Sequence, residues 1–227
     1  MRRLVCAAGV AAFFLAALPA CRPDQIQHLK DSKRIGIEAE NWVVKRIMPA
    51  DLLHATRWAG DSLTLSADRE LHRLLAERLA QGGVAAALPY CRPETYASTD
   101  SLAHVLKATA QRVSNKPRNP QHQPATQLVA SQNDTMRNIA RPSAEVFTYQ
   151  RPIVLDDALC LRCHGEVGKD IAAADYALIK KAYPTDQAIG YQRGAVVGAW
   201  QVRFARNGVA EFYTMKTRKV PKPHKLF

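Results

Sequence analysis

This chain has fewer acidic than basic residues, and it lacks both internal repeats and an apolar run long enough to span a membrane. The 227 residues include 20 acidic and 32 basic side chains, which gives a formal net charge of +12 at pH 7. A surface of this sign favours acidic partner proteins or anionic lipid headgroups. The sequence has no internal repeats, so no repeat architecture is expected. Its long apolar run, residues 4–17, is too short to span a bilayer comfortably.

A second pair of metal-binding residues is also missing. The chain has one C-x-x-C motif, residues 160–163 (CLRC), and no other C-x-x-C or H-x-x-H pair. A structural zinc site would need two more ligands, usually a second pair at similar spacing. A thioredoxin-like redox pair would need a βαβ context around the motif, which the flanking sequence does not provide. Both absences argue against these two kinds of site.

The motif continues with His164, and C-x-x-C-H is the attachment signature of a c-type haem. Two thiols at this spacing add to the two vinyl groups on one edge of the porphyrin. The adjoining imidazole then lies under the ring and can ligate the iron. We therefore predict one covalently attached haem c, with thioethers to Cys160 and Cys163 and His164 as the proximal iron ligand. The alternative is a structural C-x-x-C followed by an incidental histidine.

Residues 1–20 have the pattern of a signal peptide. A short basic region precedes the apolar run, and Ala20 stands directly before Cys21. This arrangement resembles a bacterial lipobox, whose cysteine is lipidated and becomes the mature N-terminus. We expect a periplasmic lipoprotein held at the membrane surface through Cys21, with the outer membrane favoured because Arg22 follows and not Asp. The alternative is ordinary secretion with Cys21 free. An exported protein is not expected to bind nucleic acid.

Counting the cysteines leaves one thiol without an assignment. The chain has five. Cys6 leaves with the signal peptide, Cys21 carries lipid, and Cys160 and Cys163 carry haem, so Cys91 is left over. An unpaired thiol in an oxidising compartment is a liability unless it has a partner or a function. The alternative is a buried, inert cysteine, because free cysteine is among the most buried residue types.

The first half of the mature chain has helical patterns. Residues 21–32 are polar and are expected to form a tether. Apolar residues at helical spacing, together with capping and breaking residues, predict three helices. The first spans residues 35–48 and is interrupted by Pro49. The second spans residues 66–82, with Ser66 as its cap and Gly82-Gly83 as its end. The third spans residues 102–113 and ends before Pro117.

The second half changes to strand-like patterns. Residues 146–154 are predicted to form a strand that leads into the haem motif, and residues 170–182 a helix. Residues 195–205 alternate between apolar and polar side chains, as in a strand. Asn207-Gly208 then predicts a hairpin turn, with a further strand over 209–215. The basic residues 216–227, broken by prolines, are expected to form a disordered or surface-laid tail.

Three segments resemble one protein family. Residues 118–124 (RNPQHQP) resemble a family R-N-P-x-N-x-P stretch, with His122 in place of the second Asn. Residues 151–154 (RPIV) and 160–165 (CLRCHG) resemble the strand and motif that deliver the haem. Residues 183–191 (YPTDQAIGY), followed by Gly194 and Ala195, resemble the loop before the last hairpin. The chain is similar, over residues 33–215, to the family of c-haem-binding proteins with a PAS-like fold. This implies an α+β fold, with N-terminal helices packed with a PAS-like antiparallel sheet that carries a covalent haem.

The resemblance also implies an unusual pair of axial ligands. The family's distal iron ligand is a cysteine upstream of the R-N-P segment, and Cys91 stands at that place. Cys91 is also the thiol left over by counting, so the two arguments agree. Pro89 and Pro93 flank it, which predicts a local break in its helix. The alternatives for the sixth ligand are His104, His122, Met136 or none.

Arg118, in the R-N-P segment, is the candidate partner of a haem propionate. A guanidinium suits bidentate binding of a carboxylate. The alternative is a loop cation in water, whose pairing would contribute little to stability.

Three functional classes are compatible with these predictions. The family favours a redox- or gas-sensing haem protein that a partner protein reads, since no kinase or cyclase domain is evident. An anionic thiolate stabilises ferric iron and lowers the reduction potential, and its release on reduction would open a site for NO or CO. The second class is a low-potential periplasmic electron carrier. The third, a peroxidase-like enzyme, needs an open distal site, so catalysis is not expected if Cys91 fills that site.

Overall fold

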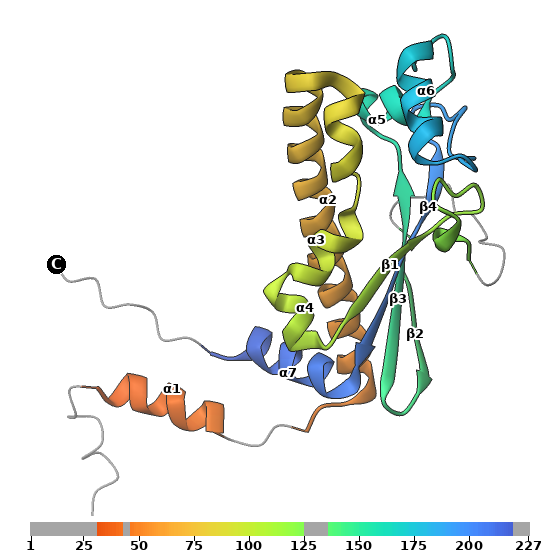
Figure 1. The fold of residues 1–227 in the computed structure, drawn as a ribbon. Coiled ribbons are helices and arrows are strands. Elements are labelled where there is room, and N and C mark those ends of the chain that lie inside the picture. Colours follow the sequence, from red (N-terminus) through yellow and green to blue (C-terminus); the bar gives the residue numbers. More distant parts are fainter. Residues whose placement is uncertain (1–30, 43–45, 125–135, 220–227) are drawn as a thin grey trace, which may run out of the picture. The chain divides into compact units, whose positions relative to one another are not determined.

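The computed structural model describes residues 31–42, 46–124 and 136–219 (Figure 1). They belong to two units, a large one spanning Arg46–Thr217 and a small one that contains α1 and residues 218–219. The predicted signal peptide, the predicted lipidation site Cys21 and most of the predicted tether and tail lie outside the described residues. Among the described helices, none is long and apolar enough to cross a membrane.

The small unit contains α1 (Ser32–Trp42), which buries none of its residues. The Asn41 amide donates to the Lys219 carbonyl at 2.9 Å and accepts the Lys219 N–H at 3.1 Å. The Lys219 ammonium also pairs with Glu40. The helix predicted over 35–48 is therefore observed as far as Trp42, whereas Met48 has extended backbone angles.

The large unit is organised around α2 (Pro49–Ala87), a helix of 39 residues. Pro49 starts it, at a position where a missing N–H costs nothing. The predicted cap at Ser66 is wrong, because small and apolar residues continue to face the core on both sides of it. The helix end predicted at Gly82-Gly83 is observed as a kink within α2. Both glycines leave the helical conformation, and Gly83 has φ +63°, before the helix resumes.

The chain then runs back beside α2 through η2 (Leu88–Tyr90), α3 (Pro93–Thr99) and α4 (Ser101–Leu106) (Figure 1). The helix predicted over 102–113 is only half right. It ends at Leu106, and Lys107 adopts a left-handed conformation with φ 47°. Residues Thr109–Val113 form strand β1 instead. Hydrogen bonding along β4 overrides their helix-like spacing, as tertiary context commonly does.

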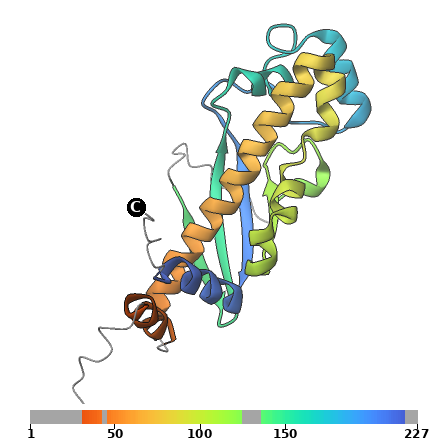
Figure 2. The same cartoon turned by 90° about the vertical axis from the view of Figure 1, so that its left-hand side faces the viewer.

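Four antiparallel strands form one sheet in the order β1-β4-β3-β2. Two of the three predicted strands are confirmed as β3 (Val146–Val154) and β4 (Val196–Ala205), while β2 (Asn138–Ser143) was not predicted. Figure 2 shows α2 lying across one face of the sheet. The inward residues of β3 and β4 pack there with α2; they include Phe147, Tyr149, Val202 and Phe204. Each such side chain contributes roughly 1.5–3 kcal/mol by leaving water.

The described part of the large unit contains three further helices. These are α5 (Ala158–His164), α6 (Ala173–Ala182) and α7 (Arg206–Thr217). The helix predicted over 170–182 is confirmed as α6. The predicted Asn207-Gly208 hairpin and the following strand are wrong, because both residues lie in the first turn of α7. Gly208 is needed for close packing, since a Cβ there would overlap the backbone of Leu106. The residues 216 and 217, assigned to the tail, also belong to α7. The fold class is α+β, as predicted.

Candidate functional site

A cavity of about 460 Å³ lies between the second half of α2, the η2 turn, the end of β3 and α5. Most of its wall is apolar, formed by leucines of α2, by residues 152–155 and by Leu159. Several of these side chains are only half-buried, so an apolar ligand would cover them further. The volume lies within the range of small-molecule and cofactor sites.

Every cysteine that the structure describes lines this cavity, and so does His164. Cys91 follows η2, whereas Cys160, Cys163 and His164 come from α5. In the described part of the chain, no group of three or more His, Cys, Asp or Glu residues is placed to hold a metal ion. The four side chains therefore surround the cavity and do not converge on one point.

The two thiols of the motif share one side of α5, because residues three apart on a helix are neighbours. Burial raises the pKa of both Cys160 and Cys163 to about 11. Nearby Asp157 raises that of Cys160 further, while Arg118 works against the rise at Cys163. Both thiols are therefore protonated at neutral pH.

The short helix α5 is fixed at both ends. The carboxylate of Asp157 accepts the Leu159 N–H at 2.8 Å, a standard N-cap. At the other end, Gly165 N–H donates to the Leu161 carbonyl at 2.8 Å. Gly165 has no room for a side chain, since a Cβ there would lie 2.5 Å from the Cβ of Asp170. The sequence around the motif therefore defines where the helix begins and ends.

His164 is held in one tautomer by the backbone. Its Nδ1 lies 2.8 Å from the carbonyl oxygen of Ala188. Burial, and then the positive charge of Arg118, lower the pKa of His164 to about 3, so the ring is neutral. A neutral ring facing a carbonyl carries its proton on Nδ1, which leaves the lone pair on Nε2. This arrangement is typical of a metal-ligating histidine, whose second nitrogen is held by an outer partner.

Arg118 fastens the motif to the loop before β4. Its Nε donates to Asp186 Oδ1 at 3.2 Å, and its Nη2 donates to the carbonyls of Cys163 and Ala188. The Arg118 side chain is 10% exposed and that of Asp186 is fully buried, so the alternative of a loop cation in water is wrong. Arg118 also lines the cavity, and its buried Nη1 has no hydrogen-bond partner among the described residues.

Cys91 lies in a short non-helical link, as its flanking prolines predicted. Its φ and ψ are −75° and 60°, and α3 begins two residues later at Pro93. The turn before it is braced, because the Tyr96 hydroxyl donates to the Tyr90 carbonyl at 2.7 Å. The guanidinium of Arg78 stacks 4.7 Å from the centre of the Tyr90 ring. The link is therefore positioned by its neighbours.

The model of the Tll0287-like family matches residues 30–205. The chain belongs to this family. The crystal structure of the cyanobacterial heme-protein Tll0287 is similar to it, with 22% sequence identity and a TM-score of 0.41. That similarity covers 62% of this chain and 91% of the cyanobacterial chain. No curated protein matches the chain.

In this member of the Tll0287-like family, the other sixth-ligand candidates do not line the cavity. His104 is in the last turn of α4, and His122 Nε2 lies 3.4 Å from Glu94 Oε1. Met136 is 55% exposed. Of the four side chains considered for the distal position, the cavity gathers Cys91 alone with the C-x-x-C-H motif.

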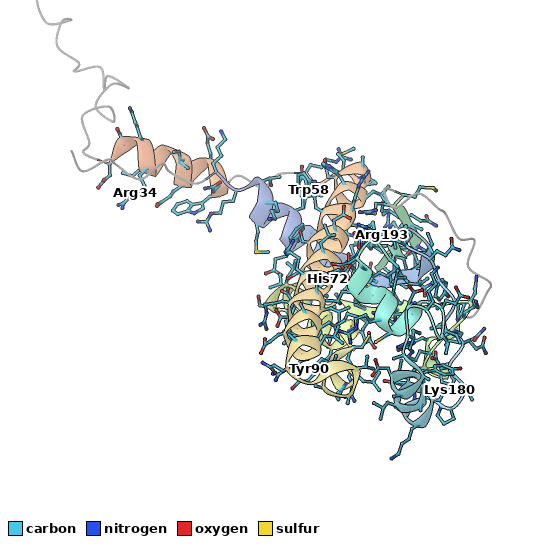
Figure 3. All side chains as sticks on the ribbon, turned by 90° about the horizontal axis from the view of Figure 1, so that it is seen from above. Arg34, Trp58, His72, Tyr90, Lys180 and Arg193 are labelled. Atoms are coloured by element: carbon cyan, nitrogen blue, oxygen red, sulfur yellow. The ribbon has the colours of Figure 1, made fainter. Side chains whose placement is uncertain are left out.

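Sequence reasoning missed His72, a histidine of α2 that does line the cavity. Figure 3 labels it on α2, close to α5. Its Nδ1 lies 3.7 Å from Asp157 Oδ2, so it faces the residue that caps α5. The spacing of His72 could have predicted its position. His72 follows Leu65 by seven residues, or two helical turns, so the two side chains lie on the same face of α2. The predicted helix began at Ser66 and so left out Leu65.

A polar network behind the cavity wall was also missed. Arg151 of β3 pairs with Asp68 of α2, and its Nε donates to the Thr64 hydroxyl at 3.1 Å. The other oxygen of Asp68 accepts the indole N–H of Trp200 at 3.0 Å. Both charged residues line the cavity. The pair therefore ties α2 to the sheet beside the cavity, and the sequence offers no local pattern that would predict it.

Proposed function

We propose that this member of the Tll0287-like family is a mono-haem c-type cytochrome that senses redox state or a gas. The observation that carries the proposal is one cavity lined by the C-x-x-C-H motif and by Cys91. Cys160 and Cys163 would form the thioethers, His164 would be the proximal ligand and Cys91 the distal ligand. When bound, haem would supply a one-electron couple and an iron that can take a diatomic gas.

The side chains present fit such a group. The two thiols stand on one side of α5, and the tautomer of His164 leaves Nε2 available as a ligand. The wall is mostly apolar, which suits a porphyrin ring. Arg118 Nη1 is a buried donor without a partner among the described residues, and it suits a propionate. We also propose that the antiparallel sheet is PAS-like, as the family resemblance implies.

Cys91 is the residue through which we expect a signal to leave the site. A thiolate donates strongly and favours ferric over ferrous iron. Cys91, as the distal ligand, would therefore be held less firmly after reduction, and protonation of its thiolate would favour release. Its link joins η2 to α3, so its movement would reach both helices. A partner protein that reads this movement would complete the sensor.

A second candidate is a low-potential electron carrier, in which Cys91 stays bound in both redox states. Prolines on both sides of the Cys91 link and the Tyr96–Tyr90 hydrogen bond favour this candidate, because they restrain the link. Carrier and sensor differ in one property. A carrier cycles without losing a ligand, whereas a redox sensor of this kind changes ligation on reduction.

We also propose that the protein faces the periplasm and is anchored through lipidated Cys21. This rests on the sequence of residues 1–22 alone. Metabolic labelling with a radioactive fatty acid tests it. Wild-type protein should take up label and stay with the membrane fraction, and Cys21→Ser should do neither. Label uptake by Cys21→Ser would contradict the assignment.

Covalent attachment is tested by making the protein in a host that matures c-type cytochromes. We expect haem to remain with the denatured wild-type chain and the intact mass to rise by one haem. Cys160→Ser and Cys163→Ser should each reduce attachment strongly, while Cys91→Ser should keep it, since Cys91 forms no thioether. A wild-type chain without covalent haem in this host would overturn the proposed function.

A further inference from the structure

The charged residues of the cavity are unevenly paired. Four arginines line it (Arg69, Arg112, Arg118 and Arg151), against two acidic residues (Asp68 and Asp156). Asp68 and Thr64 occupy the guanidinium of Arg151. Arg118 and Arg112 differ, because Arg118 Nη1 and Arg112 Nε are buried and have no hydrogen-bond partner in the part of the chain that the structure describes. Each of these two cavity-lining residues therefore carries an unused donor.

Arg112 reaches the cavity from the sheet. It lies in β1, paired with Trp200 of β4. Arg112 and Arg118 line the same cavity as His164. Arg112 is the fourth residue of β1, and Arg118 follows six residues later, before η3 (Pro120–His122), so one short stretch of chain supplies both guanidiniums.

The nearby carboxylates do not satisfy these two donors. Asp186 Oδ2 and Glu94 Oε2 are themselves buried without a hydrogen-bond partner among the described residues, and only the other oxygen of each is used. Asp186 Oδ1 accepts from both Arg118 and the Ala188 N–H. Glu94 Oε1 faces His122 at 3.4 Å. An arginine does not lose its proton in a protein, so an unpaired buried N–H of Arg112 or Arg118 is best satisfied by an anion or other acceptor in the cavity.

We propose that Arg112 and Arg118 together bind the two carboxylates of the cavity's ligand, each guanidinium taking one. The proposal rests on the proposed function, in which those carboxylates are the haem propionates. Arg112 is then a cofactor-binding residue, in addition to Arg118. A guanidinium is suited to this role, because its fixed fork matches a carboxylate where an ammonium offers a single point charge.

The test uses the mature, haem-loaded protein and three variants. Arg112→Gln removes the charge and the fork, and Arg112→Lys keeps the charge alone. Arg203→Gln is the matched control, because Arg203 is an exposed residue of β4 that does not line this cavity. Thioethers hold the haem independently of its propionates, so all three variants should retain covalent haem.

Two readings decide the outcome. The midpoint potential should fall in Arg112→Gln, because a positive charge beside the cofactor favours the reduced state, and Arg112→Lys should restore most of it. The resonance Raman propionate-bending band should shift in both Arg112 variants, since both lose the bidentate hydrogen bonds. Arg203→Gln should change neither. A potential and a Raman band in Arg112→Gln that match those of Arg203→Gln would overturn the inference. Absence of covalent haem from the wild type would instead overturn the proposed function.

Discussion

Arg118 and His164 share one acceptor, the carbonyl oxygen of Ala188. His164 Nδ1 lies 2.8 Å from it and Arg118 Nη2 lies 3.3 Å from it. The same guanidinium nitrogen also donates to the carbonyl of Cys163. One arginine thus positions both the motif and the loop that fixes the histidine tautomer. The orientation of the proposed iron ligand depends on a residue far from it in the sequence.

Loss of this arginine should cost stability. Arg118→Ala leaves Asp186 buried without its counter-charge, and breaking a buried pair in this way costs about 3–5 kcal/mol. The free energy of unfolding of the mature protein in urea measures it. Arg203→Ala, an exposed arginine of β4, should cost much less. Equal losses in the two variants would show that Arg118 does not hold the site together.

The cap of α5 gives a second prediction. Asp157→Ala removes the side chain that accepts the Leu159 N–H and should destabilise the protein by about 1 kcal/mol. Asp157→Asn keeps an acceptor and should cost only a fraction of that. Thermal unfolding of the three proteins compares them. If Asp157→Asn proves as costly as Asp157→Ala, the charge facing His72 matters more than the cap.

A third prediction concerns the end of α5. An added methyl group in Gly165→Ala would lie 2.5 Å from Asp170 Cβ and 2.7 Å from the Leu161 carbonyl. Relieving that overlap should cost about 1–3 kcal/mol and lower the yield of haem-loaded protein. Gly36→Ala is the control, because nothing lies within 4 Å of the added Cβ. Urea unfolding and the haem-to-protein ratio test the pair, and unchanged values in Gly165→Ala would contradict the packing.

Glu94 gives a prediction for acid stability. Burial alone would raise its pKa, but the hydrogen bond from His122 and the charge of Arg112 outweigh it and hold the pKa below the ordinary 4.5. A carboxyl group with a lowered pKa stabilises the fold above pH 4.5 and loses that contribution as the pH falls through its lowered pKa. Glu94→Gln should therefore flatten the loss of stability below pH 4.5 in a series of urea titrations. A slope identical to the wild type would contradict this role.

The central parts of the fold could be predicted from local patterns. In strands β3 and β4, buried and more exposed residues alternate, and the two strands pair with each other, so their sequences alone predict them. Prediction failed where distant contacts decide. Residues 109–113 have helical spacing but pair with β4, and Asn207-Gly208 has a hairpin sequence but lies in a helix packed on Leu106. In both places a partner from another part of the chain overrides the local preference.

The site shows the same division. The C-x-x-C-H motif identifies its chemistry, and counting thiols drew attention to Cys91, which lines the same cavity. His72, Arg112 and the Asp68–Arg151 pair were not predicted. Their residue types are common, and each reaches the cavity only because α2 and the sheet meet beside it. No local sequence pattern predicts this contact between α2 and the sheet.

The central claim, an iron held between His164 and Cys91, is tested most directly by the EPR spectrum of the oxidised, mature protein. The account predicts a low-spin ferric signal with the narrow spread of a thiolate-bound haem, lost in Cys91→Ser and kept in His72→Ala, which alters the same cavity. A high-spin signal in the wild type that Cys91→Ser leaves unchanged would contradict it. The iron would then be open, and Cys91 would be a buried thiol without a role at the iron.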